Sequence, residues 1–87
     1  MPTPYKTTAV WTEETLPAAI RAAHTTKAGT WGLLRVLEGK ARLVWEDGSG
    51  SVEVTPERPC PIPPEVLHHV EVDGPVRMQV EFYRERV

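Results

Sequence analysis

The stretch Cys60–Val70 (CPIPPEVLHHV) is a proline-rich segment that leads directly into an apolar strand. Proline fixes φ, removes a backbone donor and biases the preceding residue toward extended geometry. Because prolines recur from Pro56 to Pro64, this connection is predicted to be stiff and non-helical. A rigid lead-in suits a binding site, which needs its side chains held in place. The simpler alternative is a proline-rich loop whose histidines are surface residues.

Short apolar-alternating runs bounded by Gly, Pro or Asp surround this stretch. The predicted strands are residues 5–11, 31–37, 41–45, 51–55, 67–72 and 76–84. Residues 17–23 are predicted to be either one short helical turn or an extended segment. Short strands at such close spacing indicate an all-β sandwich or barrel, and the small size favours a barrel.

Length and charge limit the class of protein. The 87 residues predict one domain, 1–87, with a modest core. A net charge of −2 does not suggest a nucleic-acid or acidic-membrane partner. The single cysteine, Cys60, fits a reducing compartment. There is no apolar run of membrane-span length, and residues 1–6 do not resemble a signal peptide, so we expect a cytoplasmic protein.

Large aromatic side chains are numerous for so small a core, and a partner subunit would cover some of them. They are Trp11, Trp31, Trp45, Phe82 and Tyr83. The chain is therefore predicted to form a homodimer.

The histidines are the candidate chemical groups. Neighbouring residues on a strand face opposite sides, so only one of His68 and His69 can face the interior. Two imidazoles and a carboxylate form a common ligand set for divalent transition metals. The alternative is that His24 is a polar loop residue and Glu81 an exposed strand acid. Cys60 is expected to be an apolar filler, and the sequence names no catalytic residue.

Several stretches resemble known motifs. Residues 36–43 (VLEGKARL) resemble the turn that ends the first cupin motif. Residues 63–68 (PPEVLH) keep the P-x-G-x-x-H spacing of the second motif, with Glu65 in place of the usual Gly. Residues 16–32 and 74–84 resemble more specifically the TehB/YeaR family of small cupin-like domains, through their H-x-T-K-x-G-T-W-G and V-E-F-Y-R runs. The resemblance covers residues 5–84.

This resemblance implies an all-β fold, a small cupin-like (double-stranded β-helix or jelly-roll) barrel, with a metal site in its mouth. Residue by residue, the implied ligands are His24, His68 and Glu81, and the implied ion is Zn, Fe or Ni. The chain departs from most metal-binding cupins at Leu33, near the usual glutamate, and at Thr26, in place of a second histidine. Family members occur alone and fused to tellurite-resistance methyltransferases, but no S-adenosylmethionine loop is recognisable here.

The leading expectation is thus a cytoplasmic cupin-type domain that binds a divalent metal and a small anion during tellurite, oxyanion or oxidative stress. Lys27 and Arg77 are candidates for attracting the anion, and His69, on the opposite face, is the control. One alternative is a metal-dependent enzyme of the dioxygenase or isomerase type. The other is a metal-free dimeric interaction module.

Overall fold

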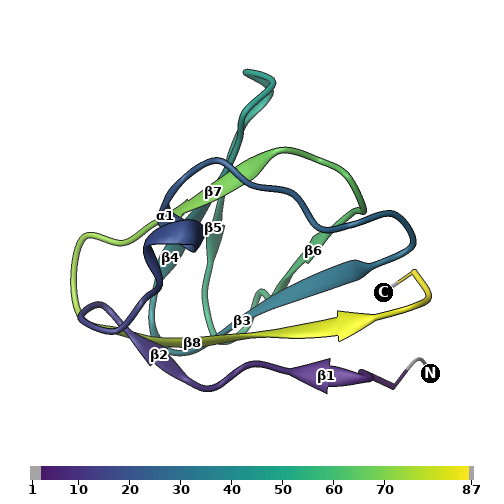
Figure 1. Cartoon of the computed structure of the whole chain (residues 1–87). Helices are drawn as coiled ribbons and strands as arrows, with labels where there is room; N and C mark the ends of the chain where they lie inside the picture. Colours follow the sequence, from purple (N-terminus) through teal and green to yellow (C-terminus); the bar gives the residue numbers. More distant parts are fainter. Residues whose placement is uncertain (1–2, 87) are drawn as a thin grey trace.

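The computed structural model describes residues 3–86, which form two antiparallel sheets and one short helix (Figure 1). Sheet A contains β1 (Lys6–Thr7), β2 (Trp11–Thr12), β3 (Trp31–Gly39), β6 (Cys60–Ile62) and β8 (Val76–Tyr83). Sheet B contains β4 (Ala41–Trp45), β5 (Gly50–Val54) and β7 (His68–Glu71). The helix α1 spans Ala18–Arg21. The predicted all-β class is confirmed, and no helix in residues 3–86 is long and apolar enough to cross a membrane.

The long strands β3 and β8 form the centre of sheet A. Leu34 lies opposite Val80 and Val36 opposite Met78, and all four side chains are buried. Successive strand residues point to opposite faces, so these side chains share the inner face. Buried and more exposed side chains therefore alternate along most of β8.

The hydrophobic core lies between the two sheets. Sheet B contributes Leu43 from β4, Val54 from β5 and Val70 from β7, all buried. Alternation places Val52 on the same face as Val54, but 38% of Val52 is exposed, because β5 is an edge strand of sheet B.

Two strand predictions need correction. Residues 5–11 do not form one strand: β1 and β2 are separate two-residue strands on β8, and between them the Thr8 hydroxyl accepts a hydrogen bond from the Val80 amide at 3.0 Å. The proline-rich connection contains β6, which was not predicted. Its Pro61 is tolerated because β6 is an edge strand, which in residues 3–86 pairs only with β3.

The strand pairings do not close the predicted small barrel. In residues 3–86 they divide the strands into two sheets, and no ladder joins sheet A to sheet B. A closed barrel needs continuous pairing around its wall. The all-β class is confirmed, and the pairings in these residues show no closed barrel.

The connection between β3 and β4 depends on Gly39. Its φ is 80°, a conformation that L side chains rarely adopt, and a Cβ at this position would overlap the backbone carbonyl oxygen of Pro75. Gly48 has a similar φ of 84° but open space around it.

Alanine substitutions at Gly39 and Gly48 distinguish the cost of backbone strain from the cost of steric overlap. We expect Gly48→Ala to lower the free energy of unfolding by about 1 kcal/mol, the usual cost of a left-handed alanine. Gly39→Ala should cost about 3 kcal/mol, because the Pro75 backbone must also move. Urea unfolding of both variants measures the difference, and equal losses would show that the overlap is unimportant.

Candidate functional site

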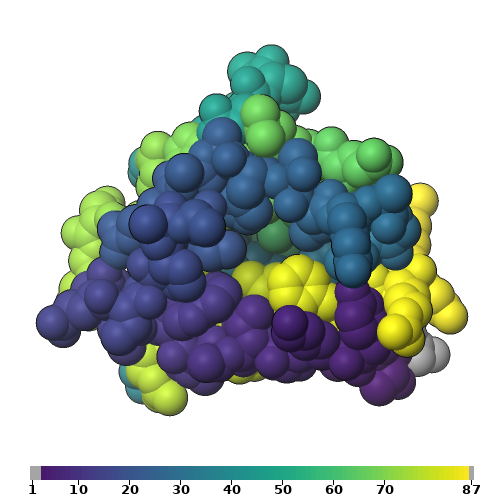
Figure 2. All heavy atoms as spheres, viewed as in Figure 1, coloured from purple at the N-terminus to yellow at the C-terminus, as the bar shows by residue number. Residues whose placement is uncertain are grey.

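A pocket of about 380 Å³ opens between the inner faces of the two sheets. Figure 2 shows a recess between the blue segment that follows α1 and the purple N-terminal segment, with green and yellow atoms visible inside it. The walls come from β1, β2, β3, β6, β7 and β8, from α1 and from the segment between α1 and β3. The lining includes Lys6, Trp11, Leu34, Ile62, His68, Val80 and Phe82, with His24, Thr25 and Lys27 from that segment.

The two histidines predicted as site residues meet in this pocket. The His24 amide donates to the His68 carbonyl and the His68 amide donates to the His24 carbonyl, both at 2.9 Å. A directly paired bridge places both side chains on the same face. Their ring centroids are accordingly 4.2 Å apart.

The segment that carries His24 is also fastened to the proline-rich lead-in. The Glu65 amide donates to the Thr26 carbonyl at 3.0 Å. The Thr26 hydroxyl lies 3.0 Å from the Thr30 carbonyl and 3.4 Å from the Pro63 carbonyl. Glu65 has a φ of 61°, so the position where the family motif has Gly does adopt a left-handed conformation. The lead-in therefore places both histidines.

Each imidazole is oriented by a carbonyl two residues before it. Nδ1 of His68 lies 2.7 Å from the Val66 carbonyl, and Nδ1 of His24 lies 3.0 Å from the Ala22 carbonyl. His68 is only 1% exposed. Burial lowers the pKa of His68, since desolvation penalises the imidazolium, although the hydrogen bond to Val66 opposes this shift. His68 is thus held as neutral imidazole.

Glu81 does not join the pair. It lies on the outer face of sheet A, because Val80 and Phe82 on either side of it point into the pocket. There its carboxylate accepts hydrogen bonds from Arg35 Nε and the Tyr83 hydroxyl, each at 2.8 Å. Residues 3–86 contain no group of three His, Cys, Asp or Glu side chains suited to a metal ion. The predicted three-residue set is therefore not assembled.

The other polar residues singled out in the sequence also divide between the pocket and the outer surface. His69 faces away from the pocket, as predicted, between the carboxylates of Glu46 and Glu71. Lys27 lines the pocket, whereas Arg77 lies 3.6 Å from Glu38 in an exposed ion pair. Of the two predicted anion-attracting residues, only Lys27 is near the histidines.

Cys60 is buried, and burial raises the pKa of its thiol. A protonated, buried thiol is a poor nucleophile, in keeping with the predicted role as an apolar filler.

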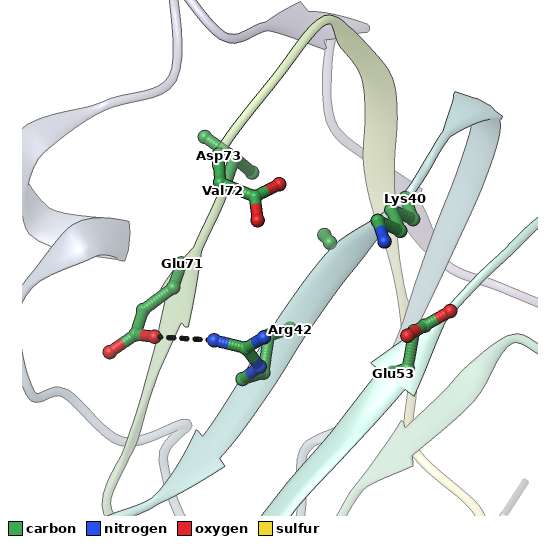
Figure 3. A pocket seen from close by; sticks show the side chains of 7 residues that line it. Lys40, Arg42, Glu53, Glu71, Val72 and Asp73 are labelled. Carbon is green, nitrogen blue, oxygen red and sulfur yellow. Dashed lines mark hydrogen bonds and ion pairs between the residues drawn. The ribbon is translucent and has the colours of Figure 1, made fainter.

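A second depression, of about 290 Å³, lies near β4, β5 and the end of β7 (Figure 3). Its walls carry both signs of charge, from Lys40, Arg42, Glu53, Glu71 and Asp73. Arg42 and Glu71 form an ion pair at 3.3 Å, drawn as the dashed line in Figure 3. With its charges mixed and partly paired, this groove presents no single ligand preference.

Sequence reasoning missed the apolar wall of the pocket. Trp11 and Phe82 are among the five aromatics of which a partner subunit was expected to cover some, and both line the pocket. Phe82 shares the inner face of β8 with Val80, and the alternation of apolar residues along this strand is the sequence signal that identifies it. Trp11 has no such signal, because β2 has only two residues.

Comparison with known proteins gives the same relatives by sequence and by structure. The model of the TehB-like domain family matches residues 6–80. Proteins from Haemophilus influenzae, named "Probable S-adenosyl-L-methionine-dependent methyltransferase TehB", are 42% identical (strain Rd) and 40% identical (strain 10810) over 72 residues. Each match covers 77% of this chain and 25% of the relative, so the chain spans about a quarter of their length.

Two solved structures share the fold. The crystal structure of TehB from Haemophilus influenzae matches with a TM-score of 0.82 and 34% identity, covering 93% of this chain and 30% of that one. A protein from Escherichia coli K12 also matches with a TM-score of 0.82, at 21% identity, over 94% of this chain and 89% of that one. The second likeness concerns the fold alone.

These relatives overturn the predicted function. They are named methyltransferases that depend on S-adenosylmethionine, not metal-binding cupins. The predictions of a metal-binding cupin domain and of a divalent Zn, Fe or Ni cofactor are therefore wrong. The physical reason within this chain is that Glu81 pairs with Arg35 on the other face of sheet A.

The two neighbouring histidines should respond to pH in opposite directions. The folded chain binds fewer protons than the unfolded chain at His68, so the free energy of unfolding should fall as the pH drops below the ordinary histidine pKa of 6.5. His69 donates hydrogen bonds to the carboxylates of Glu71 and Glu46, and these bonds raise the pKa of His69, so its contribution to stability should be lost as the pH rises through that raised value.

Urea unfolding across this pH range tests both signs. Wild type should lose more stability on acidification than His68→Phe does. The free energy of unfolding of wild type should exceed that of His69→Gln by the largest amount at acidic pH, and this difference should shrink at alkaline pH. A parallel pH profile for wild type and His68→Phe would contradict the assignment of a neutral, buried His68.

Proposed function

Because the chain belongs to the TehB-like family, we propose that it is a small-molecule-binding domain that serves S-adenosylmethionine-dependent methyl transfer. The observation that carries this proposal is the paired imidazoles of His24 and His68 in a pocket between the sheets. The pocket is within the size range of small-molecule sites, and it combines apolar walls with a few convergent polar groups. The ligand that we assign to it is the molecule to be methylated.

The residues that the structure describes do not fit the methyl donor itself. Nucleotide-type cofactors are commonly bound beyond the carboxyl ends of parallel strands, at the N-terminus of a following helix. Every ladder in residues 3–86 is antiparallel, and α1 has only four residues. We therefore assign S-adenosylmethionine to a different region or partner, and the pocket to the acceptor.

As part of the same proposal, the fold is a small jelly roll of the cupin-like type. Nested antiparallel pairing supports this: β3 pairs with β8 and β4 with β7. The next pair inward is represented by the bridge between Thr55, after β5, and Arg58, before β6. Such folding of one long hairpin is typical of jelly rolls. A cytoplasmic location completes the proposal.

We keep the homodimer as a proposal, with the outer face of sheet A as its interface. Trp11 and Phe82 are used in the pocket and Tyr83 is already buried, which leaves the half-buried Trp31 on that outer face. Leu37, on the same side of β3, is 39% exposed.

Binding by the 87-residue protein tests the pocket. The 87-residue protein is titrated with each of three probes: para-cresol, para-methylanisole and para-toluate. We expect the amide chemical shifts of residues around His24 and His68 to change and reach saturation with at least one of them. Thr25→Trp at the exposed rim should abolish these shifts, and Ser49→Trp, on the distant β4–β5 turn, should not. No saturable binding, binding that survives Thr25→Trp, or S-adenosylmethionine bound in this pocket would refute the proposal.

Sedimentation equilibrium tests the dimer. Wild type at high micromolar concentration should sediment at twice its 9.7 kDa mass, and Trp31→Glu should sediment as a monomer, because a buried charge opposes association. A wild-type protein found only at 9.7 kDa would rule the dimer out.

A further inference from the structure

The tautomer of both pocket histidines follows from their hydrogen bonds. A backbone carbonyl only accepts, so Nδ1 of His68 must donate to Val66, and Nδ1 of His24 must donate to Ala22. In a neutral imidazole the other nitrogen is then an acceptor. Nε2 of the neutral, buried His68 is therefore a hydrogen-bond acceptor, and so is Nε2 of His24 when that ring is neutral.

Neither Nε2 atom has a hydrogen-bond donor in the described part of the chain. The nearby Thr26 hydroxyl donates to backbone carbonyls, and the Thr30 hydroxyl is 3.4 Å from that of Tyr5. His68 is 1% exposed and lines the pocket, so solvent reaches its ring only through that pocket. No buried side-chain nitrogen or oxygen in residues 3–86 lacks a hydrogen-bond partner, so Nε2 of His68 is open to the pocket rather than sealed from it. A donating ligand would replace solvent at this atom, in an apolar setting that strengthens a hydrogen bond.

The other lining residues indicate what the remainder of such a ligand is made of and what charge it carries. Trp11, Phe82 and Ile62 form apolar walls, which suit a hydrocarbon or aromatic body. None of the lining residues in the described part is Asp or Glu, while Lys6 and Lys27 both contribute to the lining. This positive balance favours a group that gains negative charge as it donates its proton.

We propose that the pocket selects an uncharged small molecule with an apolar body and one weakly acidic hydroxyl or thiol, of the phenol or thiophenol class, whose proton is donated to an imidazole Nε2. The inference rests on the proposed acceptor-binding function and specifies the ligand class for that site. The selecting interaction is the hydrogen bond, and the apolar walls accept the remainder of the molecule.

The experiment compares three probes of similar shape by calorimetry with the 87-residue protein. Para-cresol carries the donor, para-methylanisole has the same body with the donor methylated, and para-toluate carries an anion without a donor. We expect para-cresol to bind about tenfold more tightly than para-methylanisole, the usual effect of one net hydrogen bond. Para-toluate should bind more weakly than para-cresol.

The variants assign this preference to the histidines. His68→Phe should bind para-cresol and para-methylanisole with equal affinity. His69→Gln, on the other face, should keep the wild-type ratio of the two affinities. If His68→Phe fails to fold, as shown by circular dichroism, the half-buried His24→Phe replaces it and should reduce the ratio.

The outcomes separate this inference from the function on which it rests. Equal binding of para-cresol and para-methylanisole to wild type would overturn the donor preference while leaving the pocket as a ligand site. Tightest binding by para-toluate would do the same in favour of anion recognition. A wild-type ratio retained in both His68→Phe and His24→Phe would show that the imidazoles do not select the donor. Binding of none of the three probes would refute the proposed function and this inference together.

Discussion

The backbone bridge between His24 and His68 is the contact on which the site depends. Two hydrogen bonds of 2.9 Å attach a segment without long strands or helices to the start of β7. Without that bridge, residues 22–30 would have few backbone partners, and the opening between the sheets would lose one wall. Bridge pairing also sets the side-chain geometry, because it places the two imidazoles on the same face. One local interaction thus determines both the shape of the pocket and its chemistry.

The proline-rich lead-in makes this bridge possible. Prolines restrict the chain before β7, and β6 fastens the first part of the lead-in to β3. Glu65 then turns the backbone at a φ of 61° and offers its amide to Thr26. A left-handed glutamate costs free energy, so the surrounding hydrogen bonds must hold it in place. The stiffness inferred from the prolines therefore has a structural purpose, which is to position two segments together.

The wrong prediction of a metal site shows how the alternation of side chains along a strand decides which face of the sheet a residue lies on. The conflict was visible in the alternation of β8, where Val80 and Phe82 have the pattern of the core side. Glu81 must then face outward, and there Arg35 and Tyr83 satisfy its carboxylate. The family resemblance matched the residue type but carried no information about the partner. Two imidazoles without a carboxylate form a pocket suited to hydrogen bonding, with a different ligand preference.

Period-2 alternation and turn residues were enough to predict the all-β class, most of β3, β4, β7 and β8, and the opposite orientations of His68 and His69, because these features depend on neighbours in the chain. The family motifs were enough to select His24 and His68. The division into two sheets, the strand β6 around Pro61 and the inclusion of Trp11 in the pocket depended on pairings between distant residues. The same is true of the outward pairing of Glu81 with Arg35, which lies 46 residues away in sequence. Local pattern determines which way a side chain faces, but only the tertiary structure decides what it meets there, since that partner comes from another part of the chain.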